Sequence, residues 1–145
     1  MPAASDGCVF CEIAAGRAPA SMVHSDDTVI AFLDIRPVNA GHLLVVPREH
    51  AAGLSDLDPA AGSAVFAVAQ RLAGALRTCG VPCGGVNLFL ADGEVAGQEV
   101  PHVHLHVLPR LPGDGFRLDV KFLSPDRAEL DATAGRIRGT LGEAG

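Results

Sequence analysis

Hydrophobic residues recur along the chain with the period of a strand in some places and of a helix in others, which divides it into short elements. Four apolar or β-branched segments, each bounded by Gly, Pro, Asn or Asp, predict strands. They cover residues 28–34, 42–47, 84–91 and 100–109. A short helix is expected at residues 8–15, ahead of these strands.

Two longer segments show the three- and four-residue spacing of an amphipathic helix. Residues 59–79 form the better of them, because Asp58 can cap the N-terminus and Pro59 suits the first helical position. The second is expected to begin after Ser124 and Pro125. The predicted apolar faces are Val65, Val68, Leu72, Leu76 and Cys79 in the first helix and Leu130, Ala134, Ile137 and Leu141 in the second.

Strands that follow one another closely, with helices on their flanks, predict an α+β fold built on an antiparallel sheet. The chain has 145 residues, of which 48% are apolar, so residues 1–145 are expected to form a single domain with a sizeable core. Residues 1–7 and 142–145 are expected to be flexible ends.

Charge and cysteine content narrow the classes of partner. The formal net charge is −6 and no run of Lys or Arg occurs, which argues against a nucleic-acid partner but leaves a small anionic ligand open. The sequence contains no stretch of about 18 apolar residues, so no membrane span is predicted. The N-terminus lacks the features of a secretory signal. A cytoplasmic location is therefore expected, where a C-x-x-C pair favours metal or redox chemistry over a disulfide.

Half of the six histidines lie at alternate positions in the last predicted strand, as His102, His104 and His106. In a strand they would share one face, with neighbours about 7 Å apart and the outer pair about 13 Å apart. Zinc needs each ligand nitrogen at about 2.0–2.1 Å, so three rings converging on one ion would be strained. A division between a metal ligand and catalytic groups is favoured over a polar strand face that happens to be histidine.

Histidine suits phosphoryl chemistry, because its neutral ring is a nucleophile near pH 7 and its cation can protonate a leaving group. The stretch HVHLHVL resembles the signature of the histidine triad family of nucleotide hydrolases and transferases, in its bacterial zinc-binding Hint-like branch. Further segments resemble the same family in the expected order, so that the resemblance covers residues 8–116. They read CVFCEIAAGRAP, AFLDIRPVNAGHLLVVPREH, ADGEVAGQEV and LPGDGF.

The resemblance implies a five-stranded antiparallel sheet with two main helices, usually in a homodimer. It also implies that the middle histidine, His104, attacks the α-phosphorus of a nucleotide and forms a nucleotidyl-histidine that water then cleaves. His106 would contact the phosphate and assist the leaving group. His42 would orient the triad, although a histidine at a strand start can equally be bonded to backbone.

The resemblance further assigns the nucleotide contacts. Asp34 matches the residue that binds the ribose hydroxyls, although an aspartate at a strand end is commonly a turn cap. The other nucleotide-binding positions implied are Phe10, Ile13, Ile35, Gln98 and Glu99. The apolar members of this set would, taken singly, be ordinary core residues.

Two positions depart from the family pattern. Ala91 stands where many members carry an Asn or Gln that touches the phosphate, and Asn87 lies four residues too early to be its replacement. Glu99 stands where Ser or Thr is frequent. Its carboxylate would repel the α-phosphate or attract a cationic leaving group, and both changes bear on the substrate.

The resemblance also implies a structural zinc site. Its ligands would be Cys8, Cys11, His50 and His102, and such a Cys₂His₂ set is a closed tetrahedral zinc site. The alternatives are a reduced, empty C-x-x-C pair and a thioredoxin-like redox pair, although the latter lacks its βαβ setting. Cys79 and Cys83 have no histidine partners in the sequence and are expected to be buried or idle thiols.

The sequence therefore predicts a hydrolase or nucleotidyl transferase that cleaves nucleoside 5′-phosphoryl compounds, such as phosphoramidates or dinucleoside polyphosphates. One alternative is a nucleotide-binding regulatory module with little turnover, which Ala91 and Glu99 favour. Another is a zinc-finger-type interaction protein, which the acidic charge and the distant spacing of the ligands disfavour. The base and the leaving group are left open.

Overall fold

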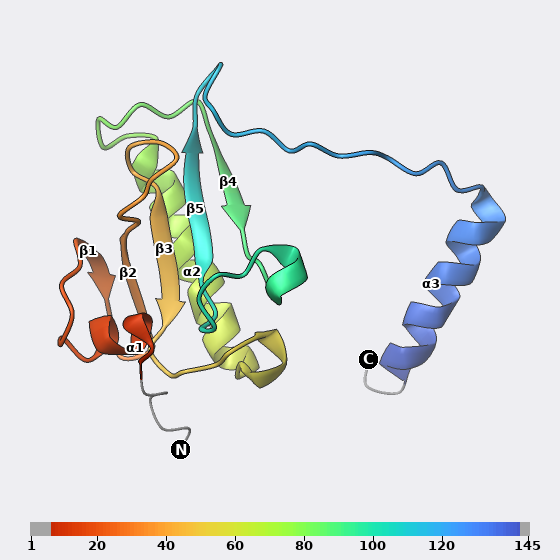
Figure 1. Ribbon diagram of the computed structural model, residues 1–145, viewed down its shortest axis with the longest axis horizontal. Helices are drawn as coiled ribbons and strands as arrows, with labels where there is room; N and C mark the ends of the chain where they lie inside the picture. The colour runs from red at the N-terminus through yellow and green to blue at the C-terminus, as the bar shows by residue number, and fades with distance from the viewer. Residues whose placement is uncertain (1–6, 143–145) are drawn as a thin grey trace.

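Five antiparallel strands form the sheet on which the rest of the chain is arranged (Figure 1). The computed structural model describes residues 7–142. The strands are β1 (Met22–Ser25), β2 (Val29–Leu33), β3 (Leu43–Pro47), β4 (Gly85–Phe89) and β5 (Leu105–Arg110), and they lie in the order β1-β2-β3-β5-β4. The helices are α1 (Val9–Ala14), α2 (Pro59–Leu76) and α3 (Arg127–Leu141), with short 3-10 turns at Leu54–Asp56 and Glu94–Ala96. This confirms the α+β class and the antiparallel sheet.

The central strands bury side chains on both faces, which explains their unbroken apolar sequence. Residues such as Val45 and Val107 pack against α2, whereas Leu44 and Val46 pack against α1 on the opposite face. Asp58 caps α2 as expected, since its side chain accepts a hydrogen bond from the backbone N–H of Ala60. The two helices therefore cover opposite faces of the sheet, and α1 lies on the face that also carries the candidate site.

The predicted strand at 100–109 is wrong at its start, because β5 begins only at Leu105. In the pairing of β3 with β5, Leu105 lies opposite Val45, so residue 103 would continue the ladder opposite Pro47. Proline has no N–H to donate to a ladder. The chain before Leu105 therefore leaves the sheet, and the backbone N–H of Val103 donates to the carbonyl of Ala51. Of the three triad histidines, only His106 lies in the strand.

Two further details differ from the expectation. Helix α2 ends at Leu76, so Cys79 lies beyond it and is exposed rather than on the apolar face, while Cys83 is half-buried. The edge strand β1 has no counterpart among the predicted strands. Its four residues, MVHS, are mostly exposed, so they carry too weak a hydrophobic pattern to be recognised.

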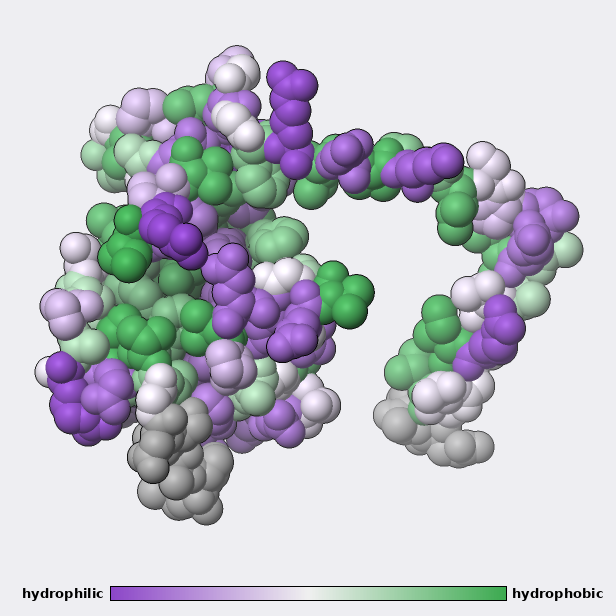
Figure 2. Space-filling model, in the orientation of Figure 1, coloured by the Kyte–Doolittle hydropathy of each residue, from purple (hydrophilic) through white to green (hydrophobic). Residues whose placement is uncertain are grey.

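The C-terminal helix forms as predicted but does not flank the sheet. Residues 117–126 run outward as an extended arm and carry α3 away from the body (Figures 1 and 2). A capping box between Asp126 and Glu129 starts the helix locally, without any contact with the sheet. The large side chains of its predicted apolar face are exposed to solvent: Ile137 is 59% exposed and Leu141 is 62% exposed.

The ends of the chain lie largely outside the description. The expectation that residues 1–7 and 142–145 are flexible falls, apart from Gly7 and Gly142, on residues that the structure does not describe. Within residues 7–142, none of the helices has the length and apolar character needed to cross a membrane.

Candidate active site and metal centre

The three triad histidines turn towards two different surroundings. The rings of His104 and His106 lie 5.1 Å apart between centroids and both line a cavity. The ring of His102 is fully buried and turns instead towards Cys8 and Cys11. The structure thus separates the first histidine from the other two, because the backbone at His102 has already left the sheet.

A backbone carbonyl determines which nitrogen of His104 is free. His104 Nδ1 lies 2.8 Å from the carbonyl oxygen of His102. A carbonyl can only accept, so Nδ1 carries the proton and donates, and the lone pair of the neutral ring is at Nε2. The Phe10 and His104 rings meet edge to face, with their centroids 5.1 Å apart, and this contact restricts the rotation of His104. In its neutral form His104 therefore has the Nε2 lone pair that a nucleophile requires.

A second chain of hydrogen bonds orients His106. The backbone N–H of Val38 donates to His42 Nδ1 at 3.1 Å, so the neutral ring of His42 carries its proton on Nε2. That N–H donates to His106 Nδ1 at 2.9 Å, which leaves the proton of His106 on its own Nε2. The sequence left two roles open for His42, a hydrogen bond to backbone and the orientation of the triad. In the structure its Nδ1 has the first role and its Nε2 the second.

Burial keeps both of these histidines neutral. Loss of hydration lowers the pKa of His42, and the nearby carboxylate of Asp34 partly offsets this. Burial, with the neighbouring His104 and His42, lowers the pKa of His106 to about 4. A proton on one ring would be repelled by a proton on the other, which favours the neutral relay described above.

These shifts predict that stability falls as the pH drops. In the unfolded chain both His42 and His106 titrate near pH 6.5. Below that pH the unfolded state therefore binds more protons than the folded state, in which the pKa of each histidine is lower. The free energy of unfolding should therefore decrease from pH 7 towards pH 4, measured by urea denaturation at each pH. His106→Asn should flatten this dependence, whereas a profile that is flat or rises towards pH 5 in the unaltered protein would contradict it.

The cavity beside His104 and His106 has a volume of about 400 Å³, the size of a small-molecule site. Much of its wall is apolar and comes from α1, the loop after it, and strands β2 and β3: Val9, Phe10, Ile13, Pro19, Ala20, Phe32, Leu33 and Leu44. Helix α1 is held in place by its buried side chains and by Arg48, whose Nη1 donates to the Ala14 carbonyl at 2.8 Å. The expected base-pocket residues Phe10, Ile13 and Ile35 all line this cavity.

Asp34 lies in the same wall, between the apolar surface and the histidines. Its Oδ1 accepts a hydrogen bond from the backbone N–H of Arg36 at 2.9 Å, as in a turn cap. Its Oδ2 lies 3.6 Å from His42 Nε2. Asp34 can therefore be both a turn cap and a polar group of the cavity wall, because its two oxygens have different neighbours.

The expected residues of the loop before the triad separate into two roles. Glu99 lines the cavity, and its carboxylate lies 3.3 Å from the guanidinium of Arg36. Gln98 is not among the lining residues, because its side chain is used within the loop. Its oxygen accepts from Gly93 N–H, and its amide donates to the carbonyls of Ala52 and Val100.

Of the two positions that depart from the family pattern, Glu99 lines the cavity, whereas Ala91 and the nearby Asn87 lie apart from it. Ala91 is buried and Asn87 accepts a hydrogen bond from Arg110 at 2.7 Å. Neither lines the cavity, so neither supplies a polar contact there.

Several cavity residues were not recognised in the sequence. Arg36 was missed, although it follows Asp34 and Ile35 directly. Phe32 could have been found from the period of two in β2, which places it on the same face as Asp34. Val9, Leu33, Leu44 and Val100 show no signal that distinguishes them from core residues.

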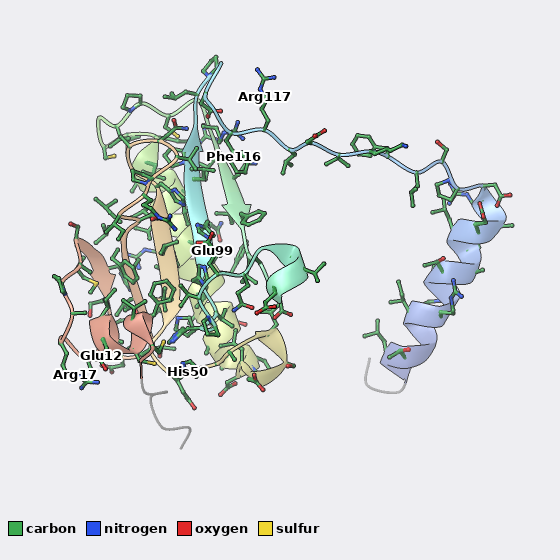
Figure 3. The ribbon with its side chains drawn as sticks, viewed as in Figure 1. Glu12, Arg17, His50, Glu99, Phe116 and Arg117 are labelled. Carbon is green, nitrogen blue, oxygen red and sulfur yellow. The ribbon has the colours of Figure 1, made fainter. Side chains whose placement is uncertain are left out.

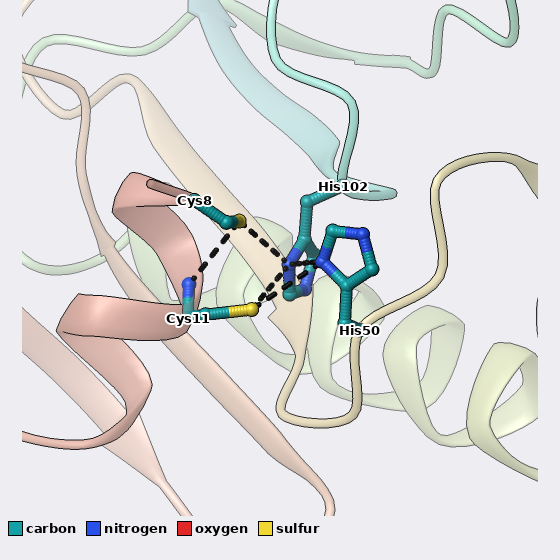
Figure 4. Close-up of side chains that lie close together, drawn as sticks. All are labelled: Cys8, Cys11, His50 and His102. Atoms are coloured by element: carbon teal, nitrogen blue, oxygen red, sulfur yellow. Dashed lines mark hydrogen bonds between the residues drawn. The ribbon is translucent and has the colours of Figure 1, made fainter. Parts of the chain in front are cut away.

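Four potential metal ligands meet at one point, although they come from three distant parts of the chain (Figure 4). Cys8 and Cys11 belong to α1 and its N-cap, His50 follows β3, and His102 precedes β5. His102 Nε2 donates to the carbonyl of Pro47 at 2.8 Å, so its Nδ1 lone pair faces the cysteines. Burial lowers the pKa of His102 and keeps this nitrogen unprotonated.

The spacing of these four side chains fits tetrahedral zinc. Bonds of about 2.3 Å to sulfur and 2.0–2.1 Å to nitrogen place S and N ligands about 3.6 Å apart and two N ligands about 3.3 Å apart. The S–N distances are 3.4 Å for Cys8 and His102, 3.3 Å for Cys11 and His50, and 3.5 Å for Cys11 and His102. The two Nδ1 atoms of His50 and His102 are 3.2 Å apart. Donor type, burial and spacing all agree with a Cys₂His₂ centre.

Asp34, His42 and His106 form a second close group, with ligand atoms within 4.8 Å of one another. This group is less suited to a metal. His42 Nδ1 accepts from Val38, so its Nε2 carries the proton in the neutral ring and has no lone pair for an ion. The group is better described as a hydrogen-bonded relay that ends at the cavity.

Comparison with known proteins agrees with this geometry. The model of the HIT domain matches residues 15–113. A HIT family protein from Bacillus anthracis superposes with a TM-score of 0.88 at 36% identity, covering 94% of this chain and 99% of the other. A zinc-bound histidine triad family protein from Mycobacterium smegmatis has a TM-score of 0.72 at 40% identity, with 92% and 97% of the two chains covered.

One relative carries the name of an enzyme. The adenosine 5′-monophosphoramidase hnt1 of Schizosaccharomyces pombe is 32% identical over 113 residues, which cover 78% of this chain and 80% of that protein. The domain match spans well over half of the chain and includes the segment of the three histidines. The chain therefore belongs to the histidine triad (HIT) family.

Proposed function

We propose that this protein is a hydrolase or nucleotidyl transferase that cleaves nucleoside 5′-phosphoryl compounds at the α-phosphorus, through a nucleotide bound covalently to His104. The observation that carries this proposal is the hydrogen bond from His104 Nδ1 to the carbonyl of His102, at 2.8 Å. It leaves the Nε2 lone pair free in a cavity of nucleotide size. The phosphoramidase among the relatives supports the same reaction class.

The lining of the cavity suggests how the substrate is held. The base packs between Phe10, Ile13 and Ile35 on the apolar wall. The ribose hydroxyls approach Asp34, whose acceptor oxygens suit a cis-diol. The α-phosphate then lies against His104 and His106, at the end of the cavity where the polar groups gather.

The reaction proceeds in two displacements. His104 Nε2 forms a bond to phosphorus while the bond to the leaving group breaks, and its electron pair departs with the leaving atom. That atom takes its proton from solvent, while the Nε2–H of neutral His106, oriented by His42, donates a hydrogen bond to it. Water then attacks phosphorus and loses a proton to solvent, and the bond between phosphorus and His104 breaks, which releases the nucleoside monophosphate and restores His104.

We further propose that Cys8, Cys11, His50 and His102 hold a structural zinc ion. Such an ion supplies folding energy rather than chemistry in this position. It would fasten α1, which carries Phe10 and Ile13, to the segment that leads into the triad. A homodimer in the cytoplasm, with nucleotides and neither nucleic acid nor membrane as partners, stays the expectation from the sequence.

A substrate panel tests the proposed function. Adenosine and guanosine 5′-phosphoramidates and diadenosine tetraphosphate should be assayed for release of the nucleoside monophosphate. We expect turnover of at least one of them, with a bound nucleotide trapped on the protein when the reaction is quenched in alkali. Binding of AMP by calorimetry without any turnover would contradict the enzyme and favour the regulatory module. That alternative rests on Ala91 and Glu99.

A further inference from the structure

The charged groups of the cavity are few and mostly acidic. Among the described residues that line it, only Asp34, Arg36 and Glu99 carry a formal charge from a carboxylate or guanidinium, and two of these three are carboxylates. Polyphosphates bring several negative charges to a site and are usually met by Arg, Lys or a metal ion. This cavity offers one guanidinium for that purpose.

That guanidinium is already paired. Arg36 Nη2 lies 3.3 Å from Glu99 Oε2, and the two side chains are 82% and 78% exposed. The pair joins the loop after β2 to the loop before the triad, so it lies across the cavity from one bordering segment to the other. Exposed ion pairs of this kind are weak, so another cation can replace Arg36 at the carboxylate.

Glu99 and His104 line the same cavity but differ in their exposure to solvent. His104 is only 6% exposed, whereas the side chain of Glu99, labelled in Figure 3, is 78% exposed. In a displacement at phosphorus the leaving group lies roughly opposite the attacking atom. With the attack coming from the buried His104, the leaving group would point away from that ring, towards the more exposed lining of the cavity, which includes Glu99.

We propose that Glu99 selects substrates by the charge of the leaving group, favouring phosphoramidates of amines that carry a second, cationic ammonium group and disfavouring polyphosphate leaving groups. This inference rests on the function proposed above and narrows its substrate class. Glu99 contacts none of the reacting atoms, so it acts as a specificity residue.

The favoured reaction balances without a further reactant. The bond between phosphorus and the amine nitrogen breaks, its electron pair stays on that nitrogen, and a proton from solvent makes it a neutral amine. Water then cleaves the bond between phosphorus and His104. The products are a nucleoside monophosphate and a diamine, whose distal ammonium stays charged throughout and interacts with Glu99.

The test compares substrates that differ only in this distal charge. Adenosine 5′-phosphoramidates of 1,3-diaminopropane and of butylamine have similar length, and diadenosine tetraphosphate supplies the polyanionic case. In the unaltered protein kcat/KM should be highest for the diamine compound. Exchanging one exposed carboxylate changes each charged interaction by a few fold, so Glu99→Gln should lower the ratio of diamine to tetraphosphate about tenfold. Added KCl should lower the same ratio in the unaltered protein.

Glu94→Gln is the matched control, because Glu94 is an exposed carboxylate of the same loop that does not line the cavity. It should leave the ratio unchanged. Equal ratios in the unaltered protein and in Glu99→Gln, with turnover present, would overturn this inference and leave the proposed function standing. A higher kcat/KM of the unaltered protein for diadenosine tetraphosphate than for the diamine compound would also overturn this inference and leave the proposed function standing. Absence of turnover on all three compounds would instead overturn the proposed function, and this inference with it.

Discussion

The variant His104→Asn is expected to abolish turnover of a nucleoside phosphoramidate while AMP still binds within a few fold of the unaltered affinity. Binding uses the apolar wall, Asp34 and the phosphate contacts together, whereas the covalent step depends on one nitrogen. An amide nitrogen is not a nucleophile. Loss of acid–base assistance alone costs about 10²–10⁴-fold, so a loss beyond that range indicates covalent catalysis.

Two measurements make this result specific. His24→Asn is the control, because His24 lies on β1 with its Nε2 2.7 Å from Asp26 and does not line the cavity. It should leave kcat unchanged. Substrate labelled in the nucleotide should leave label on the unaltered protein after quenching in alkali, and none on His104→Asn. Turnover by His104→Asn near the unaltered rate would show that another residue attacks phosphorus.

Replacing the cysteine ligands should have the second large effect, on stability rather than on chemistry. The unaltered protein, purified without added metal or chelator, is expected to contain one zinc per chain. The double variant Cys8→Ser and Cys11→Ser should lose it. A ligand present at a thousand times its Kd stabilises the folded state by about 4 kcal/mol. For a domain of this size that corresponds to a fall in Tm of about 10 °C.

Cys79→Ser provides the matched control, since Cys79 is an exposed thiol outside the cluster. It should keep both zinc and Tm. His102→Ala should resemble the cysteine variants in losing zinc and stability first, unlike the substitutions at His104. Unchanged metal content in the double cysteine variant would remove the zinc proposal, and an unaltered protein without zinc would do so directly.

Most of the elements followed from local patterns. The strands β2, β3 and β4 and the helices α1, α2 and α3 were all predicted to within a few residues, because the period of apolar side chains and the capping residues act within one element. The histidine triad could be recognised from the sequence for the same reason, because its three histidines alternate within five consecutive residues. The metal cluster required the family resemblance, because its ligands are up to 94 residues apart.

Contacts between elements determined the remainder. Strand β5 is shortened because Pro47, on a neighbouring strand, offers no N–H to its ladder. Gln98 is directed away from the cavity by hydrogen bonds with Gly93 and Ala52, and only the fold brings the carbonyl of Ala52, 46 residues away in the sequence, near its amide. Helix α3 carries a helical pattern, yet no pattern within it could reveal that the arm before it leads away from the sheet.

The sequence by itself determined the elements, the class of fold and the three histidines of the triad, because these depend on patterns of side chains within a few residues of one another. The tertiary structure alone decided the state of each group. The carbonyls of His102 and Pro47 set the tautomers of His104 and His102, and Val38 sets that of His42. A histidine becomes a nucleophile, a relay or a metal ligand according to which of its nitrogens is hydrogen-bonded, and the folded backbone supplies that partner.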